Sequence, residues 1–288
     1  MMGALRSRGQ VCCVKGEFVT SQLRFLQMPL FEFNLHPVNE VTPSGGGNDR
    51  SLSWFALTDG FFSMPVGDQI LFQYSHEMVS HWNLKNGYAD YQIAAFAWDL
   101  LECLPAAATP LPSFVENLVS NQELLTQLRA DDNNTEDEEQ DSDVWYDAWR
   151  WLQERSPSIS FLKAAPQLHF HRVGDTFRII WDTRDRIVDG IPVWSAKSGQ
   201  CSMSYSDFYQ ECLNFKDRLL KEMDQRIQEI TSGAALPQIT VDTKSLQQQQ
   251  GRWEIEFESY FGNHEPDVSW HDTELALRAI ARTKGITL

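Results

Sequence analysis

Apolar and polar residues alternate along several short stretches of the chain, which is the pattern of half-buried β-strands. The first stretch, LFEFNLHP, covers residues 30–37 and ends at a proline. Three further strands are predicted at residues 54–57, 61–66 and 70–74. The pairs Asp59-Gly60 and Gly67-Asp68 between them favour tight turns, so a β-meander is predicted here. We therefore interpret Asp59 as a turn residue and not as a catalytic acid.

A second group of strands is predicted after the middle of the chain. Residues 166–185 contain two alternating stretches joined through Gly174-Asp175. Residues 191–204 predict another hairpin, which turns around Lys197 to Gly199.

Apolar residues recur every three or four positions in the remaining segments, which is the pattern of amphipathic helices. Such helices are predicted at residues 88–105, 111–130, 142–156, 205–230, 246–261 and 272–285. Ser113 and Glu116 have the spacing of a capping box at the start of the second of these helices. Strands and helices alternate in groups without a repeated βαβ unit. The predicted fold class is therefore α+β, with antiparallel meander and hairpins packed against several amphipathic helices.

Two segments depart from these patterns. Residues 1–27 contain four basic residues against one acidic residue, and we interpret them as a non-native or disordered extension that precedes Met28. Residues 131–143 contain eight acidic residues and no basic one, which predicts a disordered loop. The rest of residues 28–288 is predicted to form a single domain, with a subdivision near residue 156 as the alternative.

The charge of the chain limits its partners. The 24 Lys and Arg against 40 Asp and Glu give a net charge of -16. Such a chain is repelled by nucleic acid and by anionic membranes, and it attracts basic proteins, so a basic protein is the expected partner. No apolar run reaches the roughly 18 residues of a spanning helix. The five cysteines form no C-x-x-C pair, which favours a reducing cytoplasm.

The chain lacks the short motifs of several large enzyme classes. It has no G-x-x-x-x-G-K-[ST], no G-x-G-x-x-G that opens a helix, no G-x-S-x-G and no H-E-x-x-H. These absences count against nucleotide hydrolysis, dinucleotide redox chemistry, α/β-hydrolase chemistry and zincin chemistry. No cofactor is expected.

His169 and His171 are the strongest candidates for a metal site. They lie two positions apart in a predicted strand, so that their side chains share one face and both imidazoles could bind one ion. A third ligand would come from a distant residue such as Asp182 or His271. The alternative, which we favour, is that both histidines lie on the solvated face of a half-buried strand.

Tryptophans next to acidic residues are the other candidate chemistry. Trp98 precedes Asp99 and Trp181 precedes Asp182, and such pairs can line a pocket for a sugar or an amine. Buried tryptophans also need a partner for the indole N–H, so core packing is the favoured interpretation. The candidate catalytic residues are therefore Asp99, Asp182, His169 and His171, without an assigned reaction.

Four motifs together resemble one known family. They are W-F-x-L-T-D-G at 54–60, Y-x-I-x-x-F-x-W-D-L-L-E-x-L-P at 91–105, F-L-x-x-A-P-x-L-x-F-x-R at 161–172, and WSAKSGQCSMSYSDF at 194–208. This set resembles an uncharacterised bacterial family of domains of unknown function, the 5984 family, from about residue 29 to the C-terminus. The resemblance implies no activity and no catalytic residue.

Two functions follow from these features. The first is a non-catalytic acidic binding protein of the immunity or antitoxin type, which inhibits a basic cytoplasmic partner. The second is an enzyme of unknown class with a pocket lined by Trp, Asp and His. Carboxylates and imidazoles that converge in a closed cleft would favour the enzyme, and a flat acidic face would favour the binding protein.

Overall fold

The computed structural model describes residues 29–43, 51–130, 138–233, 241–262 and 268–288. Helices and antiparallel sheets form the described chain, which confirms the α+β class. The predicted extension 1–27 and residues 131–137 of the acidic segment lie outside the described residues. The rest of that segment is not a loop, because helix α7 (Glu138–Gln153) begins there. No described helix is both long and apolar enough to cross a membrane.

The first half of the chain forms a four-stranded antiparallel sheet. Strand β2 (Asp59–Val66) pairs with the other three, which are β1 (Glu32–Leu35), β3 (Gln69–Leu71) and β4 (Ala89–Gln92). The predicted turn at Gly67-Asp68 is confirmed, since it joins β2 to β3 and Gly67 has a φ of 58°. The predicted strand at 54–57 is wrong, because Ala56–Thr58 is a 3-10 helix (η2).

The predicted turn at Asp59-Gly60 is also wrong, because both residues lie in β2. Gly60 pairs with Leu35, and a Cβ atom on Gly60 would collide with the backbone of β1. The glycine is thus required for the close approach of the two strands. Asp59 precedes it as the first residue of β2.

The second half contains a three-stranded antiparallel sheet in the order β5 (Gln167–Val173), β6 (Thr176–Asp182) and β9 (Gly199–Ser204). The predicted turn at Gly174-Asp175 is confirmed between β5 and β6. The predicted hairpin within 191–204 is wrong. Strand β8 (Ile191–Pro192) pairs instead with β7 (Ile187–Val188) across Asp189-Gly190, whose φ angles of 53° and 79° suit a two-residue hairpin.

Helices form in all six predicted segments, but residues 89–92 of the predicted helix 88–105 form strand β4, and the helix at His76–His81 was not predicted. The helices are α2 (His76–His81), α3 (Ile93–Glu102), α4 (Leu104–Ala108), α5 (Ser113–Ser120), α6 (Gln122–Arg129), α7, α8 (Tyr205–Thr231), α9 (Thr243–Ser259) and α10 (Trp270–Thr283). The single helix predicted at 111–130 is two helices, because Asn121 accepts a hydrogen bond from the Leu124 N–H and starts α6. Ser113 makes no capping hydrogen bond.

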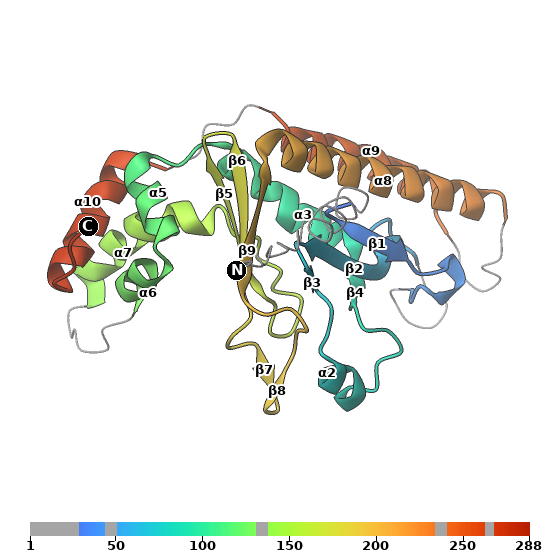
Figure 1. Ribbon diagram of the computed structural model, residues 1–288. Coiled ribbons are helices and arrows are strands. Elements are labelled where there is room, and N and C mark those ends of the chain that lie inside the picture. Colours follow the sequence, from blue (N-terminus) through green and yellow to red (C-terminus); the bar gives the residue numbers. More distant parts are fainter. Residues whose placement is uncertain (1–28, 44–50, 131–137, 234–240, 263–267) are drawn as a thin grey trace, which may run out of the picture.

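Two hydrophobic clusters lie on opposite sides of the β5-β6-β9 sheet (Figure 1). The larger cluster joins one face of that sheet to the four-stranded sheet, α3, α8 and α9. The smaller cluster joins α5, α6, α7 and α10, which we call the helical group. The helical group combines residues before 156 with the C-terminal helix. The β5-β6-β9 sheet is consequently covered on both faces.

Candidate functional site

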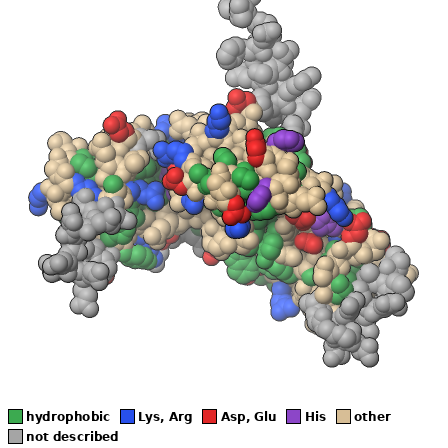
Figure 2. All heavy atoms as spheres, turned by 90° about the horizontal axis from the view of Figure 1, so that it is seen from below, with side chains coloured by type: hydrophobic (Ala, Val, Ile, Leu, Met, Phe, Trp, Pro, Cys, Tyr) green, Lys and Arg blue, Asp and Glu red, His purple; other side chains and the backbone are tan. Residues whose placement is uncertain are grey.

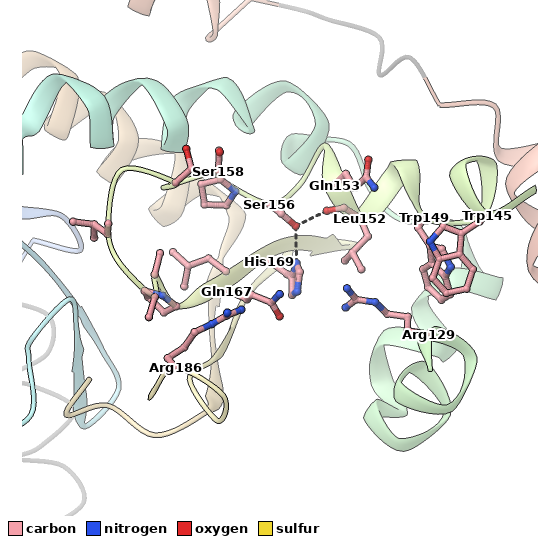
Figure 3. Close-up of a pocket in the computed structure, with 17 residues that line it drawn as sticks. Arg129, Trp145, Trp149, Leu152, Gln153, Ser156, Ser158, Gln167, His169 and Arg186 are labelled. Carbon is pink, nitrogen blue, oxygen red and sulfur yellow. Dashed lines mark hydrogen bonds between the residues drawn. The ribbon is translucent and has the colours of Figure 1, made fainter. Parts of the chain in front are cut away.

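His169 of strand β5 lines a cavity of about 560 Å³, together with residues of α7, the segment between α7 and β5, Arg129 of α6 and Arg186 (Figure 3). Serine, glutamine and arginine side chains line it together with Trp145 and Trp149. The polar lining residues used below are Arg129, Ser156, Gln167, His169 and Arg186. We call this space the His169 cavity.

Ser156 and His169 are in contact in this cavity. The Ser156 Oγ lies 2.6 Å from His169 Nδ1 and 2.5 Å from the Leu152 carbonyl oxygen. A carbonyl only accepts, so the serine hydroxyl donates to Leu152 and the imidazole Nδ1–H donates to the serine. This arrangement is the reverse of an activated serine, whose proton must pass to the imidazole. Burial, and then the Arg129 charge, lower the pKa of His169 to about 4, so the ring is neutral near pH 7.

Two arginines give the His169 cavity a positive character. Arg129 lies 5.9 Å from the centre of the Trp149 ring, and burial lowers its pKa. Among the described residues, no carboxylate forms an ion pair with Arg129 or Arg186. Figure 3 shows the Arg129 side chain directed towards His169, and Arg186 beside Gln167. The cavity therefore offers cationic and neutral donors to an anionic group.

His171 and Asp182 lie near this cavity but do not line it. His171 is buried against the helical group, 5.8 Å from the Trp151 ring. The prediction of a solvated face is therefore wrong for His171, because helices cover this side of the sheet. Asp182 accepts hydrogen bonds from Arg184 and Ser198, and these lower the pKa of its carboxyl group.

The two histidines do not gain a third metal ligand. Their rings are 6.2 Å apart and nearly parallel. Within the described parts of the chain, neither Asp182 nor His271 joins them in a group of three ligand atoms. The arrangement instead leaves two neutral rings side by side, of which His171 is buried and His169 is half-buried.

Asp99 lies at a different place, on α3. Its carboxylate accepts a hydrogen bond of 2.5 Å from the Ile159 N–H, and Ile159 has a φ of 43°. Burial raises the pKa of Asp99, and the charge of Glu102 adds to the effect. Asp99 thus holds a strained turn of the segment between α7 and β5.

A second cavity, of about 800 Å³, lies where α8 begins and α9 ends. Three half-buried tyrosines and Phe261 line it with prolines from α4 and its following turn. The residues of this tyrosine groove are Leu104, Pro105, Ala108, Thr109, Pro110, Arg172, Tyr205, Ser206, Tyr209, Gln210, Tyr260, Phe261 and Gly262. Arg172 is engaged within it, since it stacks 3.9 Å from the centre of the Tyr205 ring and donates to the Ala108 carbonyl.

Carboxylates gather beside Tyr260 at one end of the tyrosine groove. The Tyr260 hydroxyl donates to Glu256 at 3.0 Å. The negative charges of Glu102 and Asp99 also disfavour ionisation of this hydroxyl. Burial, and then these three carboxylates, raise the pKa of Tyr260. Among the described residues none of the three has an ion pair, and we call them the acidic border.

Trp98 lies next to the acidic border and is 38% exposed. Its ring meets Trp253 of α9 edge to face at 5.3 Å. The sequence pattern predicts Trp98 and Asp99 as candidate residues but does not predict the groove. Its only local signal was the pair Tyr205 and Tyr209, one helical turn apart at the start of α8.

The fold and these two cavities define an α+β protein with a cationic pocket and an aromatic groove that has an acidic border. A family model described as a family of unknown function (DUF5984) matches residues 30–276. The chain therefore belongs to this family, as its motifs indicated. Comparisons with the curated proteins and with the solved structures gave no match.

Proposed function

We propose that this chain is a non-catalytic binding protein of the immunity or antitoxin type, and that it binds a basic segment of a partner protein in the tyrosine groove. The carrying observation is the acidic border, whose three carboxylates lie near Tyr260 and have no ion pair among the described residues. A lysine or arginine of the partner would supply the missing charge. The partner would be a basic toxin of the same cytoplasm.

The composition of the groove supports recognition of a protein. Tyrosine and tryptophan combine a large apolar surface with few rotatable bonds, and they dominate the energy of many protein interfaces. Three tyrosines line the groove, and Trp98, which is 38% exposed, precedes Asp99 of the acidic border on α3. Such rings bind the stems of long basic side chains while carboxylates bind their charged ends.

The net charge of -16 supports fast capture of a basic partner but does not locate the binding surface. On the face that carries α2 and the β7–β8 hairpin, basic side chains lie between the acidic ones (Figure 2). Among the described residues, in contrast, no lysine or arginine forms an ion pair with the acidic border. The groove is therefore a better candidate than that face.

Removing the charges of Glu102 and Glu256 is expected to weaken partner binding at least about tenfold, or about 1.4 kcal/mol. The double variant Glu102→Gln/Glu256→Gln keeps an acceptor for the Tyr260 hydroxyl, so the groove should keep its shape. Immobilised wild-type protein and variant would be incubated with lysate of the source cell. Captured proteins would be identified by mass spectrometry, and the affinity of the purified partner would then be measured at two salt concentrations.

The matched control is Glu77→Gln/Glu123→Gln, which removes the same charge from exposed positions on α2 and α6. We expect this control to retain a partner of high isoelectric point that the first variant loses. A partner bound equally by both variants, or one that is acidic, would contradict the proposal.

The His169 cavity supports a second candidate function, the binding of a small anionic ligand. The specific observation is that Arg129 and Arg186 face this cavity without an ion pair among the described residues. A carboxylate or phosphate between them would be bound by charge-assisted hydrogen bonds, and Trp145 and Trp149 would contact its apolar part. An enzyme with a pocket that contains Trp and His would use this cavity, and ligand binding there is the property that can be tested.

Millimolar inorganic phosphate or benzoate is expected to raise the melting temperature of the wild-type protein by a few degrees if it binds the folded state. Arg129→Gln should abolish this rise. Arg252→Gln, an exposed arginine of α9, is the control and should retain it. An equal rise in all three proteins would show that the anions act outside the cavity.

A further inference from the structure

Three adjacent strands bring one imidazole and two carboxylates together on the outer face of the four-stranded sheet. His36 directly follows β1, and its N–H donates to the Asp59 carbonyl oxygen at 2.8 Å. Asp59 pairs with Gln92 of β4, and Phe61 pairs with Asp90. Since side chains two positions apart in a strand share a face, His36, Asp59 and Asp90 all lie on the same side.

The potential ligand atoms of these residues converge. One nitrogen or oxygen atom from each lies within 4.8 Å of the other two. The His36 Nε2 and the Asp90 Oδ1 are 2.7 Å apart. Bonds of about 2.0–2.2 Å to a tetrahedral ion would place such atoms roughly 3.3 Å apart. Small side-chain rotations are therefore enough to bring all three to one ion.

Phe61 and Arg226 hold His36 and its neighbouring strands in place. The Phe61 ring packs edge to face against the His36 imidazole, with 4.5 Å between ring centres. The buried Arg226 donates to the His36 carbonyl oxygen, and its Nη1 donates to the Leu57 carbonyl oxygen at 2.9 Å. The two chain segments that carry His36 and Asp59 are thus tied to the same guanidinium. Ligands held by rigid strands in this way need little reorganisation to bind.

The ion pair between His36 and Asp90 does not include Asp59. Its carboxylate is half-buried and has no hydrogen bond or ion pair among the described residues, whereas Asp90 already contacts His36. One carboxylate oxygen of Asp59 lies within 4.8 Å of one of Asp90, so the two negative charges repel each other. A cation between the two carboxylates would remove their mutual repulsion.

We propose that His36, Asp59 and Asp90 form a binding site for a divalent transition-metal ion, with zinc as the preferred ion. The imidazole nitrogen selects against calcium and magnesium, which prefer oxygen ligands alone. Three protein ligands leave a position for water or for a ligand, as in open zinc sites. The site is independent of the tyrosine groove and of the His169 cavity, so its test does not depend on either proposal.

The proposal is tested by zinc titration of chelator-treated full-length protein in an isothermal calorimeter. The wild-type protein is expected to bind zinc at one site that His36→Ala and Asp59→Asn each weaken at least tenfold. The matched control is His81→Ala. It removes another histidine–aspartate pair, His81 Nε2 to Asp189 Oδ2 at 3.1 Å, which has no third ligand residue among the described residues. This variant should bind zinc as the wild type does.

Asp90→Asn gives a second variant with an exposed side chain, in case Asp59→Asn fails to fold. Circular dichroism and the melting temperature would be measured for every variant before titration. Cobalt in place of zinc would give a visible absorption band whose loss in His36→Ala reports on nitrogen ligation. Zinc binding that is absent in the wild type, or unchanged in folded His36→Ala and Asp90→Asn, would overturn the proposal.

Discussion

Replacing Phe215 with alanine is expected to lower the free energy of unfolding by about 3–5 kcal/mol, as for other large core aromatics. Phe215 lies on α8 and is fully buried. Its ring packs against Phe31 at 5.1 Å, Phe33 at 5.8 Å and Phe62 at 5.9 Å. One ring thus joins the long helix to β2 and to the segment that contains β1, and its removal leaves a cavity that these elements cannot close.

Urea unfolding followed by circular dichroism and by tryptophan fluorescence would measure this effect. The control is Ile255→Ala on α9, whose side chain is 74% exposed, and we expect its effect to stay within about 0.5 kcal/mol. A Phe215→Ala protein as stable as the wild type would show that α8 does not anchor the larger cluster.

Helix α8 shows what the sequence pattern could predict. Its apolar residues repeat every three or four positions from Phe208 to Ile230, and the structure buries Phe208, Cys212, Phe215, Leu219, Met223, Ile227 and Ile230. Such a repeat places one stripe on one face, whatever the helix packs against. The β5–β6 hairpin was predictable for a similar local reason, since Gly174 permits the positive φ of its turn.

The segment before β2 shows where local reasoning failed. Thr58 accepts a hydrogen bond from the Ala94 N–H, 36 positions later in the chain, and donates to the Phe55 carbonyl. These contacts stabilise the 3-10 helix η2, and a sequence pattern contains no trace of them. The preference of Asp-Gly for turns was then overridden by the close approach of β1 at Gly60.

The candidate sites were less predictable than the fold, because their residues are distant in sequence. His36 and Asp90 are 54 positions apart, and Tyr260 meets Asp99 and Glu102 only because α9 packs near α3. Of the candidate residues, His169 lines one of the two cavities described above. Asp99 and Asp182 have structural hydrogen bonds instead, and the Asp-Gly pair wrongly predicted that Asp59 is a turn residue.

Lowering the pH from 7 to 4 is expected to destabilise the protein by about 3 kcal/mol through His169 alone. The pKa of this histidine falls from 6.5 to about 4 on folding, chiefly because of burial and then because of the Arg129 charge. Between these two values the unfolded chain binds a proton that the folded chain does not. The contribution of His169 to the free energy of unfolding is therefore fully present above pH 6.5 and is lost as the pH falls towards 4. Burial also lowers the pKa of His171, and this acts in the same direction.

Urea unfolding of the wild type and of His169→Asn at pH 7, 5.5 and 4.5 would isolate this effect. Asparagine keeps a donor for Ser156 but has no titrating ring, so the variant should lose less stability than the wild type as the pH falls. Asp59 and Asp99 have raised pKa values and act in the opposite direction, but they are common to both proteins and cancel in the comparison. The exposed His76 on α2 supplies the control variant His76→Asn, which should follow the wild type. Parallel curves for the wild type and His169→Asn would mean that folding does not lower the pKa of His169.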